Sequence, residues 1–114
     1  MSEKIYDLEP LTALVDGNEK FKKYLIELFI QTTPPILEDL KKALENGDVT
    51  EVYAHTHKVK PTLDSMGMKS LRPIVDEIMA ISKKKGSIDK LRSPVEILCN
   101  QVSTAIGQLQ SNEL

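Results

Sequence analysis

The fold of this chain is decided by the stretch Ala54-His55-Thr56-His57-Lys58-Val59-Lys60-Pro61-Thr62-Leu63-Asp64-Ser65-Met66-Gly67. When it is projected on a helix at about 100° per residue, its apolar residues fall on one side. That side, extended by one turn toward the N-terminus, is formed by Val52, Thr56, Val59, Leu63 and Met66. A stripe of this kind is typical of a helix packed on a core, and Gly67 is expected to end the helix.

The polar side of the same helix brings together His57, Lys60 and Asp64. His57 projects roughly 140° from the centre of the apolar stripe, so we expect its imidazole ring to face water. Lys60 is an i,i+3 neighbour of His57 and an i,i+4 neighbour of Asp64, so the side chains of each pair can touch. We expect Asp64 to hold the Lys60 ammonium group when no phosphate is present.

An exposed imidazole beside an ammonium group is suited to accept and release a charged group. Neutral imidazole is a nucleophile near neutral pH, because its unperturbed pKa is about 6.5. The Lys60 ammonium can compensate the charge of a phosphoryl group placed on the His57 ring. On its own the pair is more typical of two solvated side chains, so the hypothesis depends on the wider pattern.

The order of His57, Lys60 and Gly67 resembles the signature of histidine-containing phosphotransfer (HPt) domains. In that family a phosphorylatable His is followed three residues later by Lys and ten residues later by Gly. The family often has Gly where this chain has Pro61, although Pro also occurs there. The other segments that look like helices of such domains are residues 6–8, 21–35 and the Leu-rich segment up to Gly47.

The resemblance implies a role for each residue of the motif. His57 would be the phosphoacceptor, through its outer nitrogen Nε2, and Lys60 would neighbour the phosphate. Gly67 would also leave bare backbone where a partner can approach the phosphohistidine. Lys58 projects about 100° from His57 and should be solvated, with room for a role in docking an acidic partner. The residues expected at the docking or close-approach surface are Lys58, Pro61, Asp64 and Gly67.

Pro61 would interrupt the motif helix at the site itself. A proline in a helix interior removes the hydrogen bond to the carbonyl four residues back, here that of His57, and costs about 3 kcal/mol. Pro61 projects away from the core, so water can satisfy that carbonyl and the helix can bend. Two outcomes are open: a kinked helix with His57 at the bend, or a helix that ends near Lys60 and restarts.

His55 is the competing phosphoacceptor. It projects roughly 160° from His57, near the edge of the apolar stripe, and is expected to be a partly buried structural residue. The i,i+2 separation prevents the two imidazoles from converging on one metal ion while the helix persists. Zinc sites need more ligands than this sequence brings together, so we expect no metal site.

Composition excludes several classes of function. The 114 residues suit a single domain, 1–114, and the net charge of −2 includes no basic block that would indicate nucleic-acid binding. No apolar run is long enough for a membrane span, and the first residues do not resemble a secretory signal. The single cysteine, Cys99, excludes an internal disulfide and is expected to be buried. A cytoplasmic protein fits these features.

Successive amphipathic segments separated by short loops predict an all-α fold, an antiparallel up-and-down bundle with a four-helix core plus short extra helices. Asn18 is expected to cap a helix whose apolar stripe starts with Phe21, Leu25, Leu28 and Phe29. Pro34-Pro35 either kinks that helix or starts a new one. A turn at 88–91 is expected to precede a last helix that starts at Ser93-Pro94. No dimerisation seam is evident, so we expect a monomer.

The motif lacks the other parts of a kinase or phosphatase: a Gly-rich phosphate loop, a Mg²⁺ carboxylate cluster and a nucleotide site. We therefore expect no enzyme and no cofactor, but a passive phosphoryl carrier whose partner supplies Mg²⁺. The resemblance identifies the partners as receiver domains of response regulators or of a hybrid sensor kinase. Docking would use small and apolar residues around His57 and exposed residues near Pro34-Pro35.

Two alternatives stay open. The bundle could be a non-phosphorylated adaptor that binds a receiver or another signalling protein. It could also be the phosphorylated domain of a sensor kinase cut from a longer chain, which its short polar ends disfavour.

Overall fold

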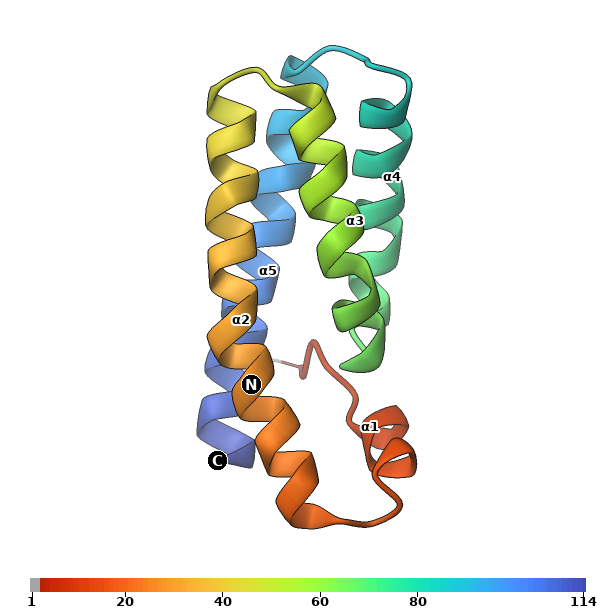
Figure 1. Cartoon of the computed structure of the whole chain (residues 1–114), viewed down its shortest axis with the longest axis vertical. Helices are drawn as coiled ribbons and strands as arrows, with labels where there is room; N and C mark the ends of the chain where they lie inside the picture. Colours follow the sequence, from red (N-terminus) through yellow and green to blue (C-terminus); the bar gives the residue numbers. More distant parts are fainter. Residues whose placement is uncertain (1–2) are drawn as a thin grey trace.

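A computed structural model describes residues 3–114 as a bundle of α-helices without a strand in that range. The elements are α1 Glu9–Leu14, α2 Glu19–Glu45, α3 Val49–Ser65, the short 3-10 helix η1 Lys69–Leu71, α4 Arg72–Lys83 and α5 Asp89–Glu113. The long helices α2 to α5 run up and down in succession, and α2 also packs on α5, which closes the ring (Figure 1). The prediction of an all-α bundle with a four-helix core and short extra helices is confirmed.

Side-chain caps fix where the first two long helices begin. Asn18 accepts a hydrogen bond from the backbone N–H of Phe21 at 3.0 Å, and Asp48 accepts one from that of Glu51 at 3.1 Å. Such caps satisfy backbone donors that have no partner within the helix, and each is worth about 1 kcal/mol. The Asp48 cap therefore fixes where α3 begins, and the buried residues of α3 decide which side of the helix, including His57, faces water.

The helix interiors contain prolines, and no helix is broken by them. α2 passes through Pro34-Pro35 as a single helix that changes direction along its length (Figure 1), so the one-helix alternative is correct. α3 passes through Pro61 to Ser65, so the restart near Lys60 is wrong. α5 already begins at Asp89, with Pro94 inside it, so a separate turn and a start at Ser93-Pro94 are also wrong. In each case the segments on both sides of the proline pack on the same core, which holds the helix together.

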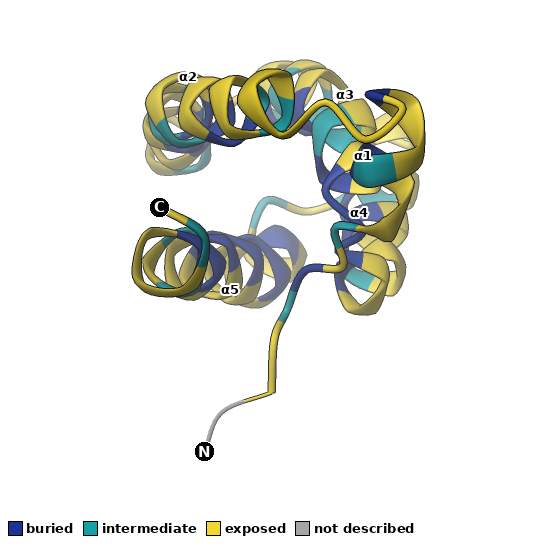
Figure 2. Cartoon of the chain, turned by 90° about the horizontal axis from the view of Figure 1, so that it is seen from below, coloured by how far each residue is buried: buried dark blue, intermediate teal, exposed yellow. Residues whose placement is uncertain are grey.

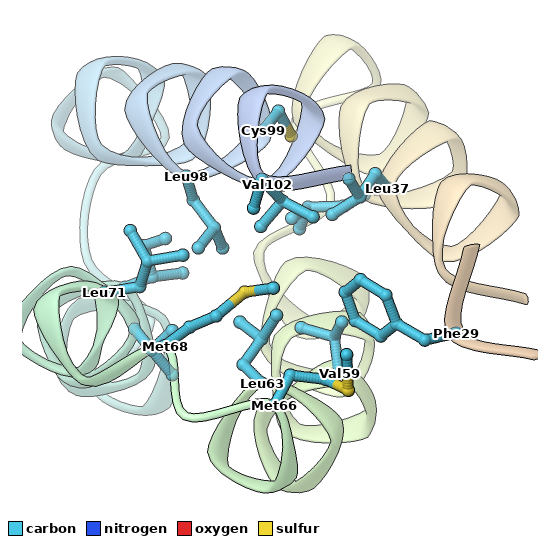
Figure 3. Packing of buried hydrophobic residues seen from close by; sticks show 14 of the residues in the cluster. Phe29, Leu37, Val59, Leu63, Met66, Met68, Leu71, Leu98, Cys99 and Val102 are labelled. Atoms are coloured by element: carbon cyan, nitrogen blue, oxygen red, sulfur yellow. The ribbon is translucent and has the colours of Figure 1, made fainter. Parts of the chain in front are cut away.

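The core lies along the axis of the bundle. Seen from below, the buried faces of the four long helices turn toward one another (Figure 2). Val52 and Val59 of α3, Ile78 of α4 and Leu98 of α5 are fully buried, each with 0% of its surface exposed. Figure 3 shows how Phe29 of α2 and the side chains after the end of α3 fill the space between the helices. The apolar stripe predicted for α3 is therefore confirmed.

The apolar stripe predicted for the start of α2 is partly wrong. Phe21 and Leu28 are 47% and 39% exposed, whereas Ile26 and Phe29 are buried. The lower turns of α2 extend below the end of α3 and lie beside α1 (Figure 1). Because the six-residue α1 covers only part of that face, some of the apolar surface stays in contact with water. This exposed surface lies toward the same end of the molecule as the C-terminal half of α3.

Candidate functional site

α3 places the predicted site residues on its water-facing side. Thr56 and Leu63 are buried, and His57 and Lys58 are exposed, as the helical projection predicted. The Asp48 cap and the buried apolar stripe fix the rotation of the helix on the bundle. The His57 imidazole is thus held at the surface by a rigid element.

The His57 ring stacks on Tyr53. The ring centroids lie 6.0 Å apart and the planes differ by 23°. The two residues are i,i+4 neighbours on α3, so helical spacing alone is enough to bring the rings together, and this contact was not among the predictions. Tyr53 is half-buried and is therefore less mobile than a free surface side chain. The stack limits the directions in which the exposed imidazole can point.

Lys60 pairs with a different carboxylate from the one predicted. Its Nζ donates to Oδ1 of Asp76 on α4 at 3.3 Å. Asp64 instead accepts a hydrogen bond from Nη2 of Arg72 at 3.1 Å. The expected Lys60–Asp64 pair within α3 is therefore wrong. α4 packs beside α3 and supplies a partner to each residue, which spacing along one helix does not reveal.

Gly67 ends α3 in a Schellman motif. Its N–H donates to the carbonyl of Asp64 at 3.1 Å, and the N–H of Met68 donates to the carbonyl of Leu63 at 3.0 Å. Gly67 has φ +67°, a left-handed conformation that glycine adopts without strain. The predicted role of Gly67 as the helix end is confirmed.

The second role expected for Gly67 is wrong, because its backbone is covered. Gly67 is buried, and a Cβ atom at this position would overlap the backbone carbonyl of Asp7. The N–H of Asp7 also donates to the carbonyl of Met66 at 3.1 Å. The close approach that requires a glycine is thus made by the N-terminal segment of the same chain, and no bare backbone is left there for a partner.

His55 lies on the other flank of α3. It is half-buried, and its Nε2 lies 3.1 Å from Oε2 of Glu51, one turn earlier. This matches the partly buried, structural position that was predicted. In residues 3–114, no group of three or more His, Cys, Asp or Glu side chains is arranged to hold a metal ion.

An open apolar groove of about 300 Å³ lies beside the C-terminal half of α3. Pro61 contributes to it and is an i,i+4 neighbour of His57, so the groove begins one turn from the imidazole. On the opposite wall, Leu14 and Leu28 are 72% and 39% exposed. The groove is lined by Leu11, Leu14, Leu25, Leu28, Phe29, Thr32, Pro61, Thr62, Ser65 and Met66. It was not predicted, because α1, α2 and α3 meet here only in the folded chain.

Two further features bear on the predictions. Cys99 is buried, as expected, and burial raises the pKa of its thiol.

In the part of the chain that the structure describes, we find no helix with the length and apolar character that a membrane crossing requires.

Comparison with known proteins gives one finding. The family model described as Hpt domain matches residues 25–112, which include all of α3, α4 and most of α2 and α5. Every predicted site residue of α3, and Gly67 after it, lies inside the matched range. No curated protein and no solved structure matches this chain.

Proposed function

The chain belongs to the Hpt domain family, and we propose that it carries a phosphoryl group reversibly between receiver-domain aspartates, with His57 as the phosphoacceptor. Hpt domains are phosphocarrier modules of two-component phosphorelays and interact with receiver domains of response regulators and hybrid kinases. The assignment of the phosphoryl group to His57 is our own inference from the positions of the side chains.

The observation that carries this proposal is the difference between the two histidines of the chain. His57 is exposed, stacks on Tyr53 and points away from the bundle core. His55 is half-buried and lies against the carboxylate of Glu51. An incoming phosphoryl group carries negative charge, so it is disfavoured beside Glu51 and accepted at the surface near the Lys60 ammonium.

The proposed transfer needs only a nucleophile from this chain. A lone pair of neutral His57, on Nε2 as the family resemblance implies, attacks the phosphorus of a receiver aspartyl phosphate. A P–N bond forms, the P–O bond to the aspartate breaks, and the carboxylate leaves with the electron pair. The reverse attack by a receiver carboxylate returns the phosphoryl group. Phosphoryl transfer also needs a metal that neutralises the phosphoryl oxygens, and we propose that the receiver supplies this Mg²⁺.

Lys60 supports the phosphorylated state in this proposal. Lys60 follows His57 by three residues on α3, so its ammonium can reach toward the ring and compensate part of the charge of the phosphoryl group. An exposed ion pair is worth roughly 0–1 kcal/mol, so Lys60 adjusts the stability of phosphohistidine without being indispensable.

We place the receiver over His57 and the apolar groove beside it. The groove begins at Pro61, and its exposed leucines, Leu14 and Leu28, offer apolar surface that a partner can bury. This arrangement would bring a receiver aspartate to the imidazole while the contact area comes from α1 and α2. Lys58, exposed on the neighbouring flank, remains available for an acidic edge of the receiver.

The proposal is tested by mixing the protein with a panel of receivers phosphorylated on aspartate, in Mg²⁺, and following the label. Wild type, His55→Gln and His57→Gln are compared side by side. We expect label on wild type and on His55→Gln, and none on His57→Gln. A folded wild-type protein that binds a receiver but takes no label from any of the panel would instead indicate the non-phosphorylated adaptor.

A further inference from the structure

We propose that Asp76 is a positioning residue for Lys60. By pairing with the Lys60 ammonium, Asp76 draws it away from a phosphoryl group on His57 and so lowers the stability of phosphohistidine. This inference rests on the proposed function and extends it, because it names the residue that adjusts the transfer equilibrium. Asp76 lies on α4, outside the motif that identifies the phosphoacceptor.

Lys60 Nζ donates to Asp76 Oδ1 at 3.3 Å, and this contact joins α3 to α4 beside the face that carries His57. The side chains of Lys60 and Asp76 are 37% and 55% exposed. A pair this accessible to water is weak and exchanges its partners readily. Lys60 is therefore held when His57 is free, but is not locked away from a competing anion.

Asp64 is an i,i+4 neighbour of Lys60, but its Oδ1 is engaged by Arg72 at 3.1 Å. In residues 3–114, Asp76 is the carboxylate within ion-pair distance of the Lys60 ammonium. In this structure Lys60 pairs with Asp76 and not with Asp64, so Asp76 is the carboxylate with which a phosphoryl group on His57 would compete.

A phosphoryl group on His57 gains from the Lys60 ammonium, and Asp76 competes for the same donor while adding a negative charge of its own. Removal of the Asp76 carboxylate frees the ammonium for the phosphoryl group. The equilibrium between receiver aspartyl phosphate and phosphohistidine should then move toward phosphohistidine by up to about fivefold, the range expected for one exposed ion pair.

The experiment measures this equilibrium constant with one phosphorylated receiver in Mg²⁺, by quantifying both phosphorylated proteins once their ratio is constant. The variants are Asp76→Asn, Lys60→Gln and the double variant. Glu77→Gln is the matched control, because it removes one negative charge from the next exposed residue of α4. Within residues 3–114, Glu77 forms no ion pair. Asp76→Glu tests rescue by a carboxylate, and thermal unfolding confirms that each variant is folded.

We expect Asp76→Asn to raise the equilibrium constant for phosphohistidine formation by about two- to fivefold. Asp76→Glu and Glu77→Gln should stay near wild type, and the effect of Asp76→Asn should shrink in the Lys60→Gln background. The role of Asp76 would be overturned, and the carrier function left intact, by either of two results. The equilibrium constant could be unchanged or lowered in Asp76→Asn, or Asp76→Asn could raise it equally with and without Lys60. Failure of wild type to accept phosphate on His57 would overturn the proposed function, and this role with it.

Discussion

Tyr53 and His57 stack one helical turn apart on α3, with ring centroids 6.0 Å apart and planes inclined by 23°. A surface histidine without such a neighbour samples several side-chain rotamers, and each unproductive rotamer lowers the fraction of encounters that can react. The half-buried phenol ring reduces this freedom without covering the imidazole.

Tyr53→Ala should therefore slow phosphoryl transfer to His57 by about two- to tenfold, the range of an aromatic pair worth about 0.5–1.5 kcal/mol. Tyr53→Phe keeps the ring and should behave like wild type. The measurement is the initial transfer rate from one phosphorylated receiver at saturating concentration. Equal rates for the alanine and phenylalanine variants would show that the stack has no part in transfer.

Alanine substitutions at Gly67 and Gly47 distinguish the cost of backbone strain from the cost of steric overlap. Both have positive φ, +67° and +68°, so an alanine at either position is strained by about 1–2 kcal/mol. A Cβ at Gly67 would also overlap the carbonyl of Asp7, whereas at Gly47 it would meet nothing within 4 Å. In urea unfolding, Gly67→Ala should lower the free energy of unfolding by at least about 1 kcal/mol more than Gly47→Ala. Equal losses would show that Asp7 does not pack on Gly67.

The apolar groove beside His57 makes a prediction about receiver binding. Leu28→Glu places a charge on the groove wall and should weaken receiver affinity by about tenfold, because burial of the exposed 39% of Leu28 is worth roughly 1 kcal/mol and the new carboxylate would have to lose water. Ile97→Glu is the matched control, since Ile97 is 43% exposed on α5 and does not line the groove. Calorimetric titration with one receiver gives both affinities. Loss of affinity in the Ile97 variant alone would place the receiver elsewhere on the bundle.

Cys99 should make the stability of the bundle fall at high pH. Burial raises the pKa of its thiol above the ordinary value of 9.0, so the folded state binds the proton more tightly than the unfolded chain. The contribution of the protonated Cys99 thiol to the free energy of unfolding is fully present below pH 9 and is lost as pH rises through the raised pKa. Burial also raises the pKa of Tyr6, which acts in the same direction from pH 10 upward.

The check is urea unfolding at pH 7 and pH 10. Wild type should lose more stability between the two values than Cys99→Ala, which lacks the thiol but keeps Tyr6. An equal loss in the two proteins would show that Cys99 is not shielded from water.

Periodicity within one helix predicted much of the fold and part of the candidate site. The apolar stripe of α3 fixed which side of that helix is buried, and from this the exposure of His57 and the half-burial of His55 followed. These positions depend only on a rise and rotation per residue that all α-helices share. The end of α3 at Gly67 was predictable for the same local reason.

Features that depend on contacts between helices were not predictable. The Lys60–Asp76 pair exists because α4 lies beside α3, and spacing along α3 favoured Asp64 instead. Gly67 is covered because the segment around Asp7 returns to the end of α3. Phe21 is exposed because α2 extends beyond α3. Sequence spacing left two outcomes open at Pro34-Pro35 and at Pro61 and placed the start of α5 wrongly at Ser93-Pro94, because packing on a shared core outweighs the loss of one helical hydrogen bond.

The central claim is that the phosphoryl group is carried by His57. The most direct test is nuclear magnetic resonance of the imidazole nitrogens, in uniformly ¹⁵N-labelled protein before and after reaction with phosphoramidate and Mg²⁺, a small donor and the metal that the receiver would otherwise supply. We predict that the ring signals of His57 change, with the phosphorus bonded to Nε2, while those of His55 stay where they were. Phosphorus bonded to His55, or to neither ring in the folded protein, would contradict the account.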